Sequence, residues 1–180
     1  MPSVIATLWP YLSEKSRLLL IFKKLTDATC EITSPVSGRY NCIAHAAFDC
    51  QRKWWPNRYL PQARKHRYWP DSVDAVRTVK AFIETFEIEG FKECTDGSLE
   101  SGYEKLALYV SPTPTIDNPL PNDAPTHMAR QLPCGKWTSK LGQEQDIVHE
   151  LPEGLEGDDY GNLWKYLKRP RIPIVPSGLT

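Results

Sequence analysis

The sequence predicts a single α+β domain in which helices come first and an antiparallel sheet follows. Apolar residues recur at helical spacing in the first half of the chain. Residues 126–132 instead alternate in the manner of a strand, with Met128 on one face and His127 on the other. The turn sequence Pro133-Cys134-Gly135 then leads to a partner segment at residues 136–141, which favours antiparallel pairing. A group of helices followed by a group of strands is typical of the α+β class.

Three helical regions are expected before the sheet. They are residues 3–26 with a break at Pro10, a short helix that begins at Cys42 after the N-cap Asn41, and a helix that Asp71 or Ser72 caps and Gly90 ends. The first region forms an N-terminal helical extension, residues 1–26, and the single domain occupies residues 27–170. A proline-spaced tail, residues 171–180, follows the domain.

The second half is predicted to supply an antiparallel sheet of about four to six strands. The strands expected from the pattern lie at residues 91–94, 103–110, 126–132, 136–141 and 163–168. The Cys42 helix is expected to pack on this sheet. A Cys42 inside a strand, or a parallel sheet, would contradict this fold.

Composition narrows the classes of function. Lys plus Arg and Asp plus Glu number 22 each, so no net charge attracts nucleic acid or an anionic membrane. The five cysteines have irregular spacing and include no CxxC pair, which indicates reduced thiols rather than a disulfide framework. The N-terminus lacks the pattern of a signal peptide, so a cytoplasmic location is expected, with non-classical export left open.

The segment from Gln51 to Pro70 is rich in aromatic and basic residues. Such interleaving can bind single-stranded nucleic acid. Because the net charge is near zero and no binding motif accompanies it, we interpret the segment as a loop that covers a cleft. Neither nucleic acid nor a membrane is an expected partner.

Cys42 is the strongest candidate for a nucleophile. As the first residue of a helix it lies beside unpaired backbone N–H groups and the positive end of the helix dipole, which both favour the thiolate. The expected consequence is a thiol pKa below its ordinary value and fast alkylation at pH 6. The alternative is that Cys42 is a small buried apolar residue.

A cysteine nucleophile needs a base, usually a histidine that a third polar group orients. His127, near the start of a predicted strand, is the best candidate. If Pro133–Gly135 is a three-residue turn, Ser139 lies diagonal to His127 and can orient the imidazole. A two-residue turn would bring Lys140 opposite His127 instead, so the third member stays open.

Four further residues are assigned to the oxyanion site or substrate pocket: Asn41, His45, Gln131 and Trp137. His45 lies on the same helix as Cys42, where its geometry suits packing better than proton transfer. His66 and His149 have no assigned role. No cofactor and no resident metal is expected. A metal site made from Cys42, His45, His127 and Cys134 remains an alternative without local ligand spacing.

Several long strings resemble an uncharacterised, mainly bacterial family of unknown function. They read YNCIAHA, GYEKLALYV, PTHMARQLPCGKWTSKLG and GLEGDDYG, and the resemblance spans residues 32–170. His45 stands where that family carries Trp, and Cys134 where it carries Asp. The order of a helix-terminal Cys, a strand His and a polar hairpin residue is similar to papain-like cysteine peptidases, in size most like the NlpC-type and CHAP amidases. That similarity implies an antiparallel sheet packed by an N-terminal catalytic helix, with residues 1–26 as an extra helix.

These features favour a cysteine hydrolase or acyltransferase that acts on an amide or thioester. Cys42 would be the nucleophile and His127 the base, while the Cys42 N–H and the Asn41 side chain would bind the oxyanion. The expected partner is then a peptide or other amide-containing substrate. The alternatives are a non-catalytic interaction module, such as an immunity or adaptor protein with residues 54–69 as its contact surface, and a toxin-like effector.

Overall fold

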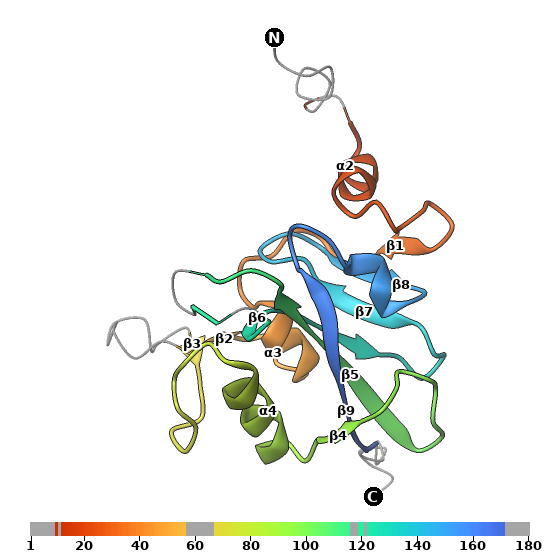
Figure 1. Ribbon diagram of the computed structural model, residues 1–180. Helices are drawn as coiled ribbons and strands as arrows, with labels where there is room; N and C mark the ends of the chain where they lie inside the picture. The colour runs from red at the N-terminus through yellow and green to blue at the C-terminus, as the bar shows by residue number, and fades with distance from the viewer. Residues whose placement is uncertain (1–9, 11, 57–66, 116–118, 121, 172–180) are drawn as a thin grey trace, which may run out of the picture.

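The computed structural model describes residues 10, 12–56, 67–115, 119–120 and 122–171. Within them the chain forms a seven-stranded sheet with the order β1-β8-β7-β6-β5-β9-β4 (Figure 1). Neighbouring strands of this sheet run antiparallel. The α+β class and the antiparallel pairing are therefore confirmed, with one strand more than the upper number expected.

The sheet contains β1 (Cys30–Ile32), β4 (Lys92–Cys94), β5 (Tyr103–Ser111), β6 (Ala124–Gln131), β7 (Trp137–Lys140), β8 (Asp146–His149) and β9 (Asn162–Pro170). The sequence analysis did not predict β1 and β8. It also missed a small parallel pair, β2 (Lys53–Trp54) with β3 (Arg67–Tyr68). These strands have two to four residues, too few for alternation to stand out.

The helices are α2 (Glu14–Ile21), α3 (Cys42–Ala46), α4 (Val79–Ile88) and the 3₁₀ helix η3 (Pro152–Leu155). The prediction that Asp71 or Ser72 begins the third helix is wrong. Thr78 is the N-cap, because its hydroxyl accepts a hydrogen bond from the backbone N–H of Ala81. No helix in the described part of the chain has the length and apolar character needed to cross a membrane.

Each face of the sheet carries its own apolar core. On the first, here called the α3 face, buried residues of α3 and α4 pack on side chains from the central strands: Leu106, Leu108, Met128 and Leu167. On the opposite face, here called the α2 face, the core contains Ala107, Tyr109, Ala129, Trp137 and Ile147. Successive strand residues therefore serve different cores, as β geometry requires.

The N-terminal extension contributes to the second core. Only residues 14–21 of the predicted helix at 3–26 form α2, while residues 1–9 and 11 lie outside the described residues. Leu18, Phe22 and Leu25 are buried in the α2-face core. Figure 1 shows α2 at the end of the molecule near β1, away from α3 and α4.

The β6–β7 hairpin has the register that a three-residue turn dictates. The N–H of Leu132 donates to the carbonyl oxygen of Lys136 at 2.7 Å, and Arg130 pairs with Thr138. Gly135 takes a φ of 89°, a conformation that glycine adopts without a steric cost. The alternative two-residue register is excluded, so Ser139 rather than Lys140 shares a face with His127.

The aromatic segment packs inward in its described part. The ring of Trp54 lies 4.5 Å from that of Tyr68, and both Trp55 and Trp69 contact Phe82 of α4. Residues 57–66 of the segment lie outside the described residues. The described aromatics therefore help to build the α3-face core.

Candidate functional site

Cys42 occupies the predicted position at the start of a helix. Asn41 is the N-cap, and its side-chain oxygen accepts from the N–H of Ala44 at 3.2 Å. The Cys42 Sγ–H donates to the carbonyl oxygen of Thr126 at 4.0 Å. The backbone N–H of Met128 is directed at the same sulfur as a hydrogen-bond donor. The helix therefore brings the sulfur to the β6 backbone on both sides of His127. Cys42 itself packs in the α3-face core, and among the described residues no hydrogen bond joins its sulfur to the His127 ring.

The predicted low pKa of Cys42 is wrong in direction. Cys42 is buried, and loss of hydration raises the pKa of its thiol to about 11. The backbone N–H groups of Met128, Ile43 and Cys42 lower the pKa, as a helix N-terminus should, but their effect is smaller. Cys42 is consequently a neutral thiol at pH 7, and fast alkylation at pH 6 is no longer expected.

His127 is fully buried and points to the α2 face. Its ring is stacked on Tyr160, with centroids 4.0 Å apart, and meets the edge of Tyr109. Its Nε2 lies 3.1 Å from Ser139 Oγ, so the predicted contact between these two residues is present. Among the described residues, its Nδ1 has no hydrogen-bond partner. Burial holds the pKa of this imidazole well below its ordinary value, so it is a neutral base.

The polar contact continues beyond Ser139. Ser139 Oγ lies 3.0 Å from His149 Nε2, and His149 Nδ1 lies 2.9 Å from the carbonyl oxygen of Leu151. His149 is also completely buried, and burial lowers its pKa to about 4. A chain of hydrogen bonds therefore links three adjacent strands, β6, β7 and β8.

The Asn41 side chain forms hydrogen bonds with the backbone of Trp54 as well as with the first turn of α3. Besides capping α3, its side-chain oxygen accepts from the N–H of Trp54 at 3.0 Å, and its Nδ2 donates to the Trp54 carbonyl oxygen at 2.8 Å. Both ends of the amide are used in this way. The predicted oxyanion role would require it to leave these partners.

Replacing Asn41 with Ala is expected to lower the free energy of unfolding by roughly 2–3 kcal/mol. The change removes a helix cap and leaves two partly buried backbone groups of Trp54 without a partner. Asn41→Ser is the control, because its hydroxyl keeps a helix-capping oxygen and removes the amide donor to Trp54. Urea titration of both variants tests this. An unfolding free energy of Asn41→Ala equal to that of the wild type would contradict the assignment.

His45 lies on the α3 face, in a second polar cluster. Its Nε2 is 3.1 Å from Thr138 Oγ1, and its Nδ1 is 3.9 Å from Asp146. Asp146 also accepts from Tyr40 Oη at 2.5 Å and lies 3.7 Å from Lys140 Nζ. Burial lowers the pKa of His45 to about 4. The cluster accounts for the contact of His45 Nε2, whereas its Nδ1 has no hydrogen-bond partner among the described residues.

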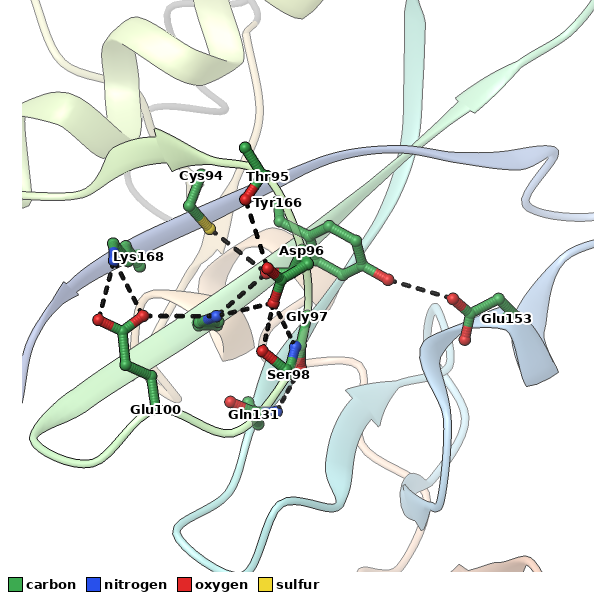
Figure 2. Close-up of polar contacts among 11 residues, drawn as sticks. Cys94, Thr95, Asp96, Gly97, Ser98, Glu100, Gln131, Glu153, Tyr166 and Lys168 are labelled. Atoms are coloured by element: carbon green, nitrogen blue, oxygen red, sulfur yellow. Dashed lines mark hydrogen bonds and ion pairs between the residues drawn. The ribbon is translucent and has the colours of Figure 1, made fainter.

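Gln131 and Trp137 share a face with His127 but lie at the far end of the hairpin. Four residues of strand separate Gln131 from His127, which is roughly 13 Å. Gln131 Nε2 donates to the Gly97 carbonyl oxygen at 2.7 Å and so holds the loop before β5, as Figure 2 shows. In that loop Asp96 accepts from the Ser98 N–H. The structure therefore does not bring Gln131 to the candidate site, and it places Trp137 opposite His149 rather than beside His127.

Residues 31–168 match the model of a protein family described as Domain of unknown function (DUF7689). The chain belongs to this family. No curated protein and no solved structure matches the chain. The DUF7689 region includes Cys42, His127, Ser139 and His149, whereas α2 precedes it.

Two residues of the DUF7689 region at this site were not predicted from the sequence. His149 was left without a role because β8 was not predicted, so nothing placed it opposite Trp137 and beside Ser139. Tyr160 lies within the string GLEGDDYG, which carried the family resemblance and was the one available signal. The carbonyl oxygen of Tyr160 accepts from Thr126 Oγ1, and this holds its loop against β6.

Tyr160 also lines a cavity of about 540 Å³ between α2 and loops that include the turn from β7 to β8. Phe22, Leu141 and Glu144 form other parts of its wall. One aromatic side chain thus contacts both the cavity and the imidazole of His127.

The described residues do not support the alternative metal site. Within them, no three His, Cys, Asp or Glu side chains gather in a way that could hold a metal ion. Cys134 is exposed in the turn before β7, whereas Cys42 and His127 are buried.

Proposed function

We propose that the protein is a cysteine hydrolase or acyltransferase in which Cys42 attacks an amide or thioester carbonyl and His127 is the general base. The supporting observation is the unpartnered Nδ1 of a fully buried imidazole, on the residue whose backbone neighbours contact the Cys42 sulfur. A buried polar atom without a partner is uncommon in folded proteins and needs an explanation. Transfer of the thiol proton would supply one for His127, although the Nδ1 of His45 also lacks a partner among the described residues.

The Cys42 thiol and the His127 imidazole are both neutral at pH 7, so the thiol must lose its proton during the reaction. Sγ and His127 Nδ1 are not hydrogen-bonded in the structure, so the reaction requires that they first be brought within hydrogen-bond distance. His127 Nδ1 would then accept the Sγ proton as the sulfur bonds to the carbonyl carbon, and would return the proton to the leaving nitrogen or sulfur as that bond breaks. Water, deprotonated by the same imidazole, would release the acyl group as a carboxylic acid. Another nucleophile in the place of water would make the reaction an acyl transfer.

The local backbone can supply part of the oxyanion site. The N–H of Cys42 belongs to the first turn of α3, where N–H groups have no partner within the helix. Asn41 would act indirectly, because its amide positions this turn. The order of a helix-terminal Cys, a strand His and a hairpin Ser is similar to papain-like cysteine peptidases, which also supports the proposal.

Substrate would approach through the cavity beside Tyr160. The ring of Tyr160 covers one face of His127, so its displacement would join the cavity to the imidazole. Tyr160→Ala is therefore expected to increase the acylation rate of Cys42. Tyr166→Ala, which removes a Tyr ring that contacts Trp137 instead, is the matched control.

Acetylation by p-nitrophenyl acetate tests the proposal. The background carries Cys50→Ser and Cys134→Ser, because these two cysteines are exposed. Mass spectrometry of peptides is expected to find acetyl groups on Cys42, well ahead of Cys30 and Cys94. His127→Ala should lower the rate at least ~100-fold, the usual contribution of a general base.

Two outcomes would overturn this assignment: an unchanged Cys42 acetylation rate in His127→Ala, or equal rates at Cys30, Cys94 and Cys42. Circular dichroism of each variant confirms that the fold is retained. Cys42→Ala gives the rate of acetylation and ester hydrolysis that does not depend on the site.

The interaction module remains a second candidate, because Cys42 is buried among apolar residues of the α3-face core. Residues 54–69 are less suited to be its contact surface, because Trp54, Trp55 and Trp69 pack on Phe82 or Phe86 of α4. A partner protein, rather than a peptide or amide substrate, would then occupy the remaining surface. Absence of acetylation at Cys42 in every variant, Tyr160→Ala included, would favour this function.

A further inference from the structure

The hydrogen-bond chain from His127 to Leu151 has only one consistent set of proton positions. It begins at the carbonyl oxygen of Leu151, which can only accept. His149 Nδ1, at 2.9 Å, must therefore carry a proton and donate it. Because burial lowers the pKa of His149 to about 4, this imidazole is neutral at pH 7 and its Nε2 is an acceptor.

The remaining positions follow from this one. Ser139 Oγ lies 3.0 Å from His149 Nε2, so its only proton is donated to that nitrogen. The hydroxyl oxygen must then accept from His127 Nε2, 3.1 Å away on its other side. His127 is neutral, so a proton on Nε2 leaves a lone pair on Nδ1.

We infer that His149 is a positioning residue, which acts through Ser139 to hold His127 in the tautomer with its proton on Nε2 and its lone pair on Nδ1. This is the tautomer that a general base needs at Nδ1, and in that respect the inference rests on the proposed function. The Leu151 carbonyl oxygen sets the direction of the whole chain. Neither His149 nor Leu151 touches the imidazole that they orient.

Long-range ¹H–¹⁵N NMR of the full-length protein, labelled with ¹⁵N-histidine, reads the tautomers directly. At pH 7.5 the Nδ1 of His127 and the Nε2 of His149 are expected to give signals of unprotonated nitrogen. Ser139→Ala should produce a mixture of tautomers at His127. The signals of His45, on the opposite face of the sheet, should not change.

Two substitutions of His149 separate its two contacts. Gln places an amide near the position of Nε2 but loses the contact with Leu151, so nothing fixes which end of the amide meets Ser139 and His127 should become a mixture. Asn can still donate to Leu151 but does not reach Ser139, so His127 should become a mixture. An Nδ1-protonated His127 in the wild type would overturn the inference, as would an unchanged His127 spectrum in both Ser139→Ala and His149→Asn.

The spectra also separate this inference from the proposed function. The chain of protons does not include Cys42, so Cys42→Ala should leave the tautomers unchanged. If the tautomers follow the chain but Cys42 is never acetylated, the proposed function fails alone. If Cys42 is acetylated in a His127-dependent manner but the tautomers do not respond to His149, the inference fails alone.

Discussion

Lowering the pH from 7 to 4.5 is expected to remove much of the stability of the protein. Burial holds the pKa of His45 and His149 at about 4, and that of His127 well below its ordinary value of 6.5. The unfolded chain takes up protons near pH 6.5, whereas the folded chain does not. Stability is therefore fully present above pH 6.5 and falls as the pH decreases toward 4.

The loss is large because three described histidines contribute together. Each one costs about 1.4 kcal/mol per pH unit within this window, so the three could cost up to about 4 kcal/mol per unit. Over the roughly 2.5 units of this window the loss reaches at most about 10 kcal/mol, which would unfold a domain in the lower part of the ordinary range of about 5–15 kcal/mol. Carboxylates with lowered pKa, such as Asp49 and Glu156, lose their contribution only as the pH falls below about 4 and do not obscure the effect.

Urea titrations followed by tryptophan fluorescence at several pH values between 7 and 5 measure this dependence. His149→Gln removes one of the three groups and should reduce the slope by about a third. A free energy of unfolding that stays constant from pH 7 to pH 5 would show that the folded imidazoles take up protons over the same pH range as those of the unfolded chain, and would contradict the lowered pKa values.

Gly161→Ala is expected to lower the free energy of unfolding by about 2–5 kcal/mol. Gly161 has a φ of 73°, which costs a residue with a Cβ roughly 1–2 kcal/mol. A Cβ there would also overlap the backbone carbonyl group of Val110, which has little freedom to move within β5. Overpacking of this kind typically costs another ~1–3 kcal/mol. The change should also displace Tyr160 from His127.

Gly102→Ala is the matched control for this substitution. Gly102 has a φ of 80°, but a Cβ there would meet no atom within 4 Å. It should therefore show the conformational cost alone. Equal losses in the two variants, measured by urea unfolding, would mean that the backbone near Val110 adjusts without cost.

The parts of the fold that could be predicted are those with local signals. The N-cap Asn41, the turn at Pro133–Gly135 and the long strands β5, β6 and β9 each follow from nearby residues. The start of α4 did not, because Asp71, Ser72 and Thr78 are all good caps and tertiary packing selects among them. The short strands β1 and β8 are defined by their pairing with other strands, β1 with β8, which is distant in sequence, and β8 with β7.

The candidate site was predictable to a similar extent. Alternation and turn length placed Ser139 beside His127, and this contact is present. The rise of a strand also shows that Gln131, four residues further along the same face, lies too far from His127. The pKa of Cys42 depends on burial by segments distant in sequence. Its position at the start of a helix therefore predicted a lowered pKa, whereas the pKa is raised. His149 required knowledge of a strand that has no sequence pattern of its own.

The neighbouring residues Ser139 and Lys140 have a consequence for the specificity of folding. Ser139 satisfies two buried imidazoles on the α2 face, while the Lys140 ammonium lies near Asp146 on the α3 face. A slip of β7 by one residue would exchange the faces of both side chains. It would bury a cation among aromatic rings and leave His127 and His149 without their shared hydroxyl. Alternative pairings of the hairpin are thereby penalised on both faces of the sheet at once, so that only one alignment of β7 remains favourable.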